Sequence, residues 1–195
     1  MRKIVIASGN RGKLKEIARI LEPLEFEVMA QSEFGVPEAD EPHRTFVENA
    51  LEKARNASFH TGLPALADDS GICVEHLSGE PGIHSARFSG EPKSDQRNNE
   101  KLLEMLQGVS DRRAHYYCVI VFLRHPEDPE PLIAEGRWRG VLLDEYRGSG
   151  GFGYDPLFYV PEYAMTAAEL PVETKNRVSH RAQAMAGIME KLKWG

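Results

Sequence analysis

Apolar residues along this chain recur with two different spacings. Short apolar runs predict buried strands, and apolar residues three or four positions apart predict amphipathic helices. Strands are predicted at residues 3–7, 26–30, 72–74, 114–124 and 132–143, and the apolar run at 63–67 indicates one more. Helices are predicted at about 12–21, 45–59, 94–107 and 179–192.

Two segments have the sequence of a capping box, in which Ser or Thr caps a helix start and a Glu three residues later caps it in return. Thr45 and Glu48 form the first and open the second predicted helix, and Thr166 and Glu169 form the other. Strands that alternate with helices indicate an α/β protein, and two long strands joined by a proline-rich turn add an antiparallel pair. We therefore expect an α/β fold with a mixed sheet. The 195 residues show no linker or repeat, so we expect a single domain over residues 1–195, with room for two lobes that share a core.

The composition is that of an ordinary globular protein, with 41% hydrophobic and 28% charged residues. A net charge of −6 argues against general binding to nucleic acid or to a membrane surface, since both normally require a basic field. The apolar N-terminal run is too short for a signal peptide, and no apolar run approaches the length of a membrane span. Cys73 and Cys118 lie in apolar stretches without a Cys-x-x-Cys spacing, which favours core thiols over a disulfide. We expect a soluble, cytoplasmic protein.

Asp68 and Asp69 directly follow the apolar run at 63–67. Burial of an unpaired ionised group is strongly unfavourable, so two adjacent carboxylates at the end of a buried strand need a partner. A divalent cation is the usual partner, and an all-oxygen site suits Mg²⁺. The alternative is a turn at the strand end in which one aspartate caps the backbone. These two residues alone leave both interpretations open.

The first predicted strand leads into a glycine turn and then a helix, with the sequence Ser8-Gly9-Asn10-Arg11-Gly12-Lys13. Such a turn points free backbone N–H groups and the positive end of the helix at whatever lies above it, which favours phosphate. The spacing matches neither the P-loop nor the dinucleotide-binding fingerprint. The alternative is a tight helix entry that binds no ligand.

A second glycine-rich segment, residues 148–156, contains Phe152-Gly153-Tyr154-Asp155. An aromatic ring between glycines can turn outward and stack on a base, with an acidic group near enough to read the base edge. The alternative is a hairpin loop with Phe152 tucked into the core.

Lys175, Arg177, His180 and Arg181 lie around the start of the last predicted helix, where Ser179 is the expected N-cap. Cations oppose the positive end of a helix, so this cluster indicates a bound anion or a carbonyl-rich ligand. The alternative is a solvated helix end that carries surface cations.

A series of short motifs follows in order along the chain: Ser8-Gly9-Asn10-x-x-Lys13, Glu41, Thr45-Phe46-x-Glu48-Asn49-Ala50, Ala67-Asp68-Asp69-Ser70-Gly71, Gly150-Gly151-Phe152-Gly153-Tyr154-Asp155-Pro156 and Ser179-His180-Arg181. Together they resemble the Ham1/inosine triphosphate pyrophosphatase family, whose bacterial branch is the dITP/XTP pyrophosphatases. The resemblance spans nearly the entire chain. One departure is His84, where family members usually carry tyrosine.

The resemblance implies an elongated α/β fold of two lobes with the substrate in the cleft between them, and usually a homodimer. It implies Mg²⁺-dependent hydrolysis of non-standard purine triphosphates (ITP, dITP, XTP) to the monophosphate and pyrophosphate. Asp69 would be the catalytic carboxylate and a metal ligand, with Glu41 and Asp68 completing the metal region. Other matched residues would bind the substrate: Ser8, Gly9, Asn10, Arg11, Gly12, Lys13, Ser70, Phe152, Gly153, Tyr154, Asp155, Lys175, His180 and Arg181.

The positive charges of the chain fit the function that the resemblance implies. A magnesium triphosphate needs several cations, and Lys13, Lys53 and Lys175 each stand beside one of the motifs. Two other functions are a Maf-type pyrophosphatase for modified pyrimidine or methylated nucleotides and a nucleotide sensor without catalysis. The combination of Phe152 with His180-Arg181 argues against the first, and the joint presence of Glu41, Asp68 and Asp69 argues against the second.

Overall fold

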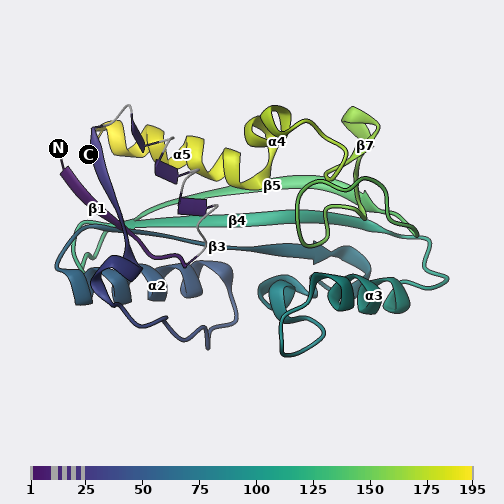
Figure 1. Cartoon of the computed structure of the whole chain (residues 1–195), viewed down its shortest axis with the longest axis horizontal. Helices are drawn as coiled ribbons and strands as arrows, with labels where there is room; N and C mark the ends of the chain where they lie inside the picture. Colours follow the sequence, from purple (N-terminus) through teal and green to yellow (C-terminus); the bar gives the residue numbers. More distant parts are fainter. Residues whose placement is uncertain (1, 10–12, 15–16, 19–20, 23–24, 195) are drawn as a thin grey trace. The chain divides into compact units, whose positions relative to one another are not determined.

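The structure, a computed structural model, describes residues 2–9, 13–14, 17–18, 21–22 and 25–194. The predicted helix at 12–21 therefore falls largely outside the described residues, although residues 13, 14, 17, 18 and 21 within it are helical. The described strands form one sheet in the order β2-β1-β3-β4-β5-β6-β7, and Figure 1 labels β1, β3, β4, β5 and β7 of this sheet. Their bounds are β1 Arg2–Ile6, β2 Phe26–Ala30, β3 Ala65–Val74, β4 Arg113–Leu123, β5 Leu132–Leu142, β6 Phe158–Val160 and β7 Met165–Thr166.

The sheet contains both strand directions. β1 lies parallel to β2 and to β3, with Ile6 opposite Ala30 on one side and Leu66 on the other. β5, β6 and β7 pair antiparallel, and β4 and β5 are neighbours, as expected for the two long strands. The α/β fold with a mixed sheet is thus confirmed. Beyond the partly described segment at 13–21, the α-helices are α2 Phe46–Thr61, α3 Asp95–Met105, α4 Val172–Val178 and α5 His180–Trp194.

The chain divides into two compact units. Unit 1 comprises Met1–Asp69, Cys118–Glu135 and Gln183–Gly195, and unit 2 comprises Ser70–Tyr117 and Gly136–Ala182. The boundaries fall inside β3, β4, β5 and α5, so these elements contribute residues to both units.

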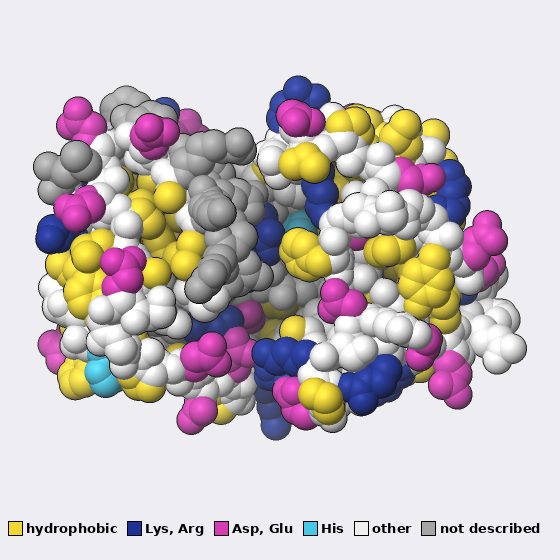
Figure 2. All heavy atoms as spheres, in the orientation of Figure 1, with side chains coloured by type: hydrophobic (Ala, Val, Ile, Leu, Met, Phe, Trp, Pro, Cys, Tyr) yellow, Lys and Arg dark blue, Asp and Glu magenta, His cyan; other side chains and the backbone are white. Residues whose placement is uncertain are grey.

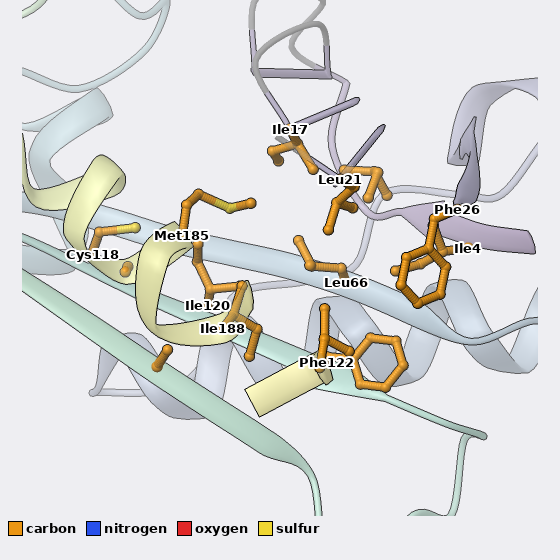
Figure 3. Packing of buried hydrophobic residues seen from close by; sticks show 14 residues of the cluster. Ile4, Ile17, Leu21, Phe26, Leu66, Cys118, Ile120, Phe122, Met185 and Ile188 are labelled. Carbon is orange, nitrogen blue, oxygen red and sulfur yellow. The ribbon is translucent and has the colours of Figure 1, made fainter. Parts of the chain in front are cut away.

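Each unit has an apolar core of its own. In unit 1, Figure 3 shows Leu66 of β3 and Ile120 of β4 among side chains that reach toward Met185 and Ile188 of α5. In unit 2, Leu102 of α3 belongs to a cluster with Phe158 of β6 and with further residues of β3, β4 and β5. Burial of these side chains supplies the main favourable term for each unit.

β3 corrects one of the sequence-based expectations. The sequence predicts a strand end or a turn at Asp68 and Asp69, but β3 continues through both, and both lie buried within it. The expectation is wrong because each carboxylate pairs with a lysine from another segment, Lys13 or Lys53, which offsets the cost of burial.

The segment after β3 approaches that strand closely. At Gly71 a Cβ atom would lie 2.2 Å from the carbonyl oxygen of Gly82, so the position requires glycine. Ser85 completes the contact, since its Oγ accepts the N–H of Ile72 at 2.9 Å. Both Gly82 and Ser85 belong to a 3₁₀ helix, η4 Gly82–Arg87, in a stretch where the sequence pattern predicts neither a helix nor a strand.

Helix α2 begins as the first capping box predicts. Thr45 Oγ1 accepts the N–H of Glu48 at 3.3 Å. Ser94 caps α3 in the same way, through the N–H of Arg97 at 3.3 Å. The second capping box forms only in part: Glu169 accepts the N–H of Thr166 at 2.8 Å, but residues 167–169 make a turn and the next helix, α4, begins only at Val172.

The cationic segment near the C-terminus is divided between two helices. Ser179 caps α5 as predicted, since its Oγ accepts the N–H of Ala182 at 3.3 Å. Lys175 and Arg177 do not lie at the start of that helix but in α4. The reason is the extended backbone of Ser179, with φ −65° and ψ 161°, which ends α4 before α5 begins.

Three properties of the surface and the thiols complete the fold. Cys73 and Cys118 are free, as expected. Within the described ranges, no helix combines the length and the apolar character needed to cross a membrane. Figure 2 shows acidic and basic side chains interspersed over the visible face of the molecule.

Candidate functional site

Unit 1 brings three predicted carboxylates together with two lysines, and we name these five residues the carboxylate–lysine group. Lys13 Nζ lies 2.7 Å from Asp68 Oδ2. Lys53 Nζ lies 2.9 Å from Asp69 Oδ1 and also pairs with Glu41. Consecutive residues of a strand point to opposite faces, which explains why the two aspartates have different lysine partners. Glu41 and Asp69 therefore form one subgroup around Lys53, and Asp68 with Lys13 forms the other.

One face of α2 builds the subgroup around Lys53. Asn49 accepts the N–H of His43 at 3.2 Å, and Asn56 donates to the carbonyl oxygen of Pro37 at 2.8 Å. Lys53 follows Asn49 by four residues and precedes Asn56 by three, so all three share this face. The face holds the segment from 37 to 43 and brings its Glu41 next to Lys53.

Burial and neighbouring charges shift the pKa values of Asp69 and Lys53 in this subgroup. Burial raises the pKa of the Asp69 carboxyl, Lys53 opposes the rise, and the negative charges of Glu41 and Asp68 add to it. Burial also acts to lower the pKa of Lys53, but the attraction of Asp69 and hydrogen bonds with Glu41 and Asp69 outweigh that effect and raise it. Lys53 therefore stays charged at neutral pH, while Asp69 has the increased proton affinity that suits a general base.

The predicted metal ligands Glu41, Asp68 and Asp69 are divided between the two lysine subgroups. Among the described residues, no three His, Cys, Asp or Glu side chains form a group that could hold a metal ion. Lys53 pairs with both Glu41 and Asp69. Asp69 Oδ2 nevertheless is buried and has no hydrogen-bond partner in the described part of the chain. An unsatisfied buried polar atom costs about 1–3 kcal/mol, so this oxygen and the all-oxygen donor set fit a hard cation such as Mg²⁺.

Half of the predicted phosphate-binding turn is described. Ser8, Gly9 and Lys13 lie within the described residues, whereas Asn10, Arg11 and Gly12 lie outside them. Ser8 follows β1 directly and donates its N–H to the carbonyl oxygen of Ile6 at 2.9 Å. Lys13 thus remains the described cation of this turn, close to Asp68.

Unit 2 contains the other predicted residues, beginning with the segment 148–156, which we name the aromatic loop. Phe152 is 62% exposed, so the alternative in which it fills the core is wrong. Lys175 of α4 places its Nζ 5.3 Å from the centroid of the Phe152 ring. The loop therefore presents an accessible aromatic ring beside a cation, an arrangement suited to stacking on a base.

Asp155 holds the aromatic loop from inside. It is 3% exposed, and its Oδ2 accepts the N–H of Phe152 at 2.9 Å and pairs with Lys175. Its Oδ1 accepts the hydroxyl of Tyr116 at 3.2 Å. Gly151 makes room for this carboxylate, because a Cβ there would lie 2.0 Å from Asp155 Oδ2. Asp155 is thus engaged with its own loop, and direct contact with a base edge stays a prediction.

The peptide groups next to Phe152 are held by α3. The N–H of Gly153 donates to Asp95 Oδ2 at 2.7 Å, and its carbonyl oxygen accepts from Asn99 Nδ2 at 2.9 Å. Asp95 and Asn99 are four residues apart and share one helix face. Tyr154 is buried, and its hydroxyl donates to the carbonyl oxygen of Ser85 at 2.8 Å. The loop backbone is therefore fixed at successive residues.

His180 and Arg181 open α5, and they are 7% and 8% exposed. The His180 ring stacks on Tyr116, with centroids 4.8 Å apart and an interplanar angle of 11°. A buried guanidinium such as that of Arg181 near a helix start opposes the helix dipole, which favours an electron-rich ligand there. Ser70, the first residue of unit 2, is half-buried in β3.

Sequence reasoning did not single out Tyr116, Asp95 or Asn99. Tyr116 lies in an apolar strand and has no sequence signal that separates it from a core residue. Asp95 and Asn99 do have a sequence signal. They are two polar residues four positions apart after an N-cap, which indicates a helix side that faces solvent or a loop.

The mixed α/β sheet, the buried carboxylates with lysine partners and the exposed ring beside a cation indicate a nucleotide-binding α/β protein. Residues 4–191 match the family model described as Ham1 family. A dITP/XTP pyrophosphatase of Nitrosomonas europaea is 65% identical over 192 residues, which cover 98% of this chain and 95% of that protein. A dITP/XTP pyrophosphatase of Chromobacterium violaceum is 61% identical, with coverage of 98% and 97%. The chain belongs to the Ham1 family.

Solved structures agree with this assignment. A HAM1 protein from Coxiella burnetii superposes with a TM-score of 0.97 at 46% identity, over 100% of both chains. The Ham1 protein of Staphylococcus aureus superposes with a TM-score of 0.92 at 41% identity, over 99% of both chains.

Proposed function

We propose that the protein is a Mg²⁺-dependent pyrophosphatase that converts the non-standard purine triphosphates ITP, dITP and XTP to their monophosphates and pyrophosphate. The observation that carries the proposal is the carboxylate–lysine group, in which the buried Asp69 keeps one oxygen without a described partner beside a lysine. The names of the two relatives, dITP/XTP pyrophosphatase, support the substrate class.

The carboxylate–lysine group is suited to a metal triphosphate. Glu41 and Asp69, which share Lys53, would hold Mg²⁺, and Asp68 would add negative charge nearby. When bound, the metal would neutralise phosphate charge and favour ionisation of a water molecule. Lys13 and Lys53 would exchange their carboxylate partners for phosphate oxygens, which form charge-assisted hydrogen bonds of the same kind.

Asp69 is proposed as the general base. Its carboxylate would accept a proton from the attacking water, whose oxygen forms a bond to the α-phosphorus. The bond from the α-phosphorus to the bridging oxygen then breaks, and pyrophosphate leaves with the electron pair.

The base would be selected in unit 2. Hypoxanthine and xanthine carry a carbonyl at position 6, whereas adenine carries an amino donor there. Arg181 has donors only and His180 can offer one, so a 6-carbonyl is satisfied while a 6-amino group meets donor against donor. Phe152 would stack on either purine without telling them apart. GTP shares the 6-carbonyl, so its rejection has to act at the 2-amino position.

The alternatives are less well supported. The Ham1 family model matches residues 4–191, which removes the reason to assign the chain to the Maf-type pyrophosphatases. A sensor without catalysis has no use for the oxygen of Asp69 that lacks a described partner. As the resemblance implies, we also propose a homodimer that acts in the cytoplasm, and light scattering of the purified protein tests the dimer.

Incubation with ITP and Mg²⁺ followed by chromatographic separation of the products tests the reaction. We expect IMP and pyrophosphate in equal amounts. Release of orthophosphate would contradict attack at the α-phosphorus, and absence of turnover would support the sensor. Turnover that persists undiminished in excess chelator would contradict the role of Mg²⁺.

A further inference from the structure

Tyr116 of β4 contacts both elements of unit 2 that carry proposed base-binding residues. Its hydroxyl donates to Asp155 Oδ1 at 3.2 Å, within the aromatic loop. Its ring stacks on the imidazole of His180, at the start of α5, with centroids 4.8 Å apart. Tyr116 is 8% exposed, so these contacts are made from inside the unit.

The hydroxyl acts on Phe152 through Asp155. One oxygen of that carboxylate accepts the Phe152 N–H and pairs with Lys175, and the other accepts the Tyr116 hydroxyl. The two oxygens are rigidly joined, so a bond to Oδ1 fixes the direction in which Oδ2 presents itself to the loop. Burial, with the negative charge of Asp155 next, raises the pKa of Tyr116 well above its usual value, so the hydroxyl keeps its proton and remains a donor.

The ring of Tyr116 acts on His180. The interplanar angle of 11° sets the imidazole plane parallel to the phenol ring. Tyr116 itself cannot turn, because it also packs against Phe158 at 4.7 Å and Trp138 at 6.3 Å between centroids. A side chain locked by packing is what a precise binding site requires behind the residues that touch the ligand.

We propose that Tyr116 is a positioning residue for the purine, which sets the Phe152 ring through Asp155 and the His180 imidazole through stacking. It touches no substrate itself. The inference rests on the proposed function, since it assigns to Phe152 and His180 the roles given to them above.

The substitution Tyr116→Phe tests the inference because it keeps the stacked ring and removes only the hydroxyl. We expect KM for ITP and Kd for IMP to rise roughly tenfold, the lower end of the effect of losing a hydrogen bond to a charged group. The kcat for ITP and inhibition by pyrophosphate should not change, because neither depends on the base. The matched control is Tyr117→Phe, the same change on the next residue, whose side chain points to the other face of the strand.

An unchanged Kd for IMP in Tyr116→Phe would overturn the proposal. A rise in KM accompanied by an equal fall in kcat and an equal weakening of pyrophosphate inhibition would also overturn it, because such a result would show a general structural role. A double variant with Asp155→Asn gives a second measurement: the hydroxyl acts through Asp155, so Tyr116→Phe should weaken IMP binding no further there, and additive losses would contradict this. A wild-type protein that neither binds IMP nor hydrolyses ITP would refute the proposed function instead.

Discussion

The carboxylate–lysine group of unit 1 and the aromatic loop of unit 2 are held together by different kinds of interaction. In unit 1 the described contacts join opposite charges, such as Lys13 with Asp68 and Lys53 with Asp69. In unit 2 the loop contains one ion pair, Asp155 with Lys175, but it is held mainly through its backbone, at the N–H of Phe152 and at both polar atoms of Gly153. Ion pairs can exchange one partner for another of like charge, whereas a fixed backbone keeps its shape whether or not ligand is present.

This difference corresponds to what each group is proposed to bind. A triphosphate with its metal brings large charges that the protein must balance before and after binding, and exchangeable pairs do this. A purine brings a flat surface and a few polar atoms, and a preorganised loop limits the entropy lost when it binds. The two groups should therefore respond differently to substitution.

The largest effect is expected at Asp69. Asp69→Asn should retain the fold but lower kcat by about 10²-fold or more, the scale expected when a general base is removed. Steady-state assays on ITP with saturating Mg²⁺ measure the loss. Asp68→Asn is the matched control in the same strand and should lose less, since Asp68 pairs with Lys13 rather than with the Lys53 subgroup. Equal losses would contradict the separation into two subgroups.

The lysines should distinguish the phosphate chain from the nucleoside. Lys13→Ala and Lys53→Ala should each weaken binding of a triphosphate by about 1.5–3 kcal/mol, the value of a hydrogen bond between charged groups. Binding of IMP should weaken less, because the outer phosphates are missing. Calorimetric titration with IMP and with a non-hydrolysable ITP analogue compares the two. If both ligands lose the same affinity, the lysines act on the fold or on the nucleoside.

The next effect concerns base selectivity. Arg181→Ala should lower the ratio of kcat/KM for ITP to kcat/KM for ATP, because the 6-carbonyl loses its donor. The expected loss of stabilisation for ITP relative to ATP is about 1–3 kcal/mol. Phe152→Ala should instead slow both nucleotides alike, since stacking does not depend on the 6-substituent. Competition assays with mixed nucleotides give the ratio directly. A ratio that Phe152→Ala changes more than Arg181→Ala would reverse the roles assigned to them.

The smallest effect is expected at Asn99. Asn99→Ala frees the carbonyl oxygen of Gly153 and should weaken IMP binding by about 0.5–1.5 kcal/mol, the value of a neutral hydrogen bond. Gln96→Ala is the control on the same helix, because the Gln96 side chain donates to the exposed Glu100 of that helix at 2.8 Å. Faster hydrogen exchange at residue 153 in Asn99→Ala, absent from the control, would show that the loop has loosened. Unchanged exchange and affinity would mean that α3 does not hold the loop.

Much of the fold could be predicted from the sequence because local signals agree with it. The Thr45 and Glu48 capping box opens α2, and Ser94 and Ser179 cap their helices. The failures have a common cause in contacts between distant segments. β3 continues through Asp68 and Asp69 because Lys13 and Lys53, far away in sequence, compensate the two charges.

The candidate site was predicted less completely than the fold. Residues with a motif, such as Asp69 and Phe152, could be named from the sequence. Tyr116, which contacts both Asp155 and His180, could not, because a tyrosine in an apolar strand has the same pattern as any core aromatic. What distinguishes it is the position of its hydroxyl relative to Asp155, which depends on the pairing of strands and on loop geometry.

Selectivity among purine triphosphates is the central claim, and one comparison tests it most directly. Purified protein with Mg²⁺ is assayed for release of pyrophosphate from ITP and from ATP under matched conditions, and kcat/KM is determined for each. A site that presents donors to position 6 of the purine suits a 6-carbonyl and opposes a 6-amino group, which predicts that ITP exceeds ATP by a large factor. Equal values for the two nucleotides would contradict the proposed roles of His180 and Arg181 and the function built on them.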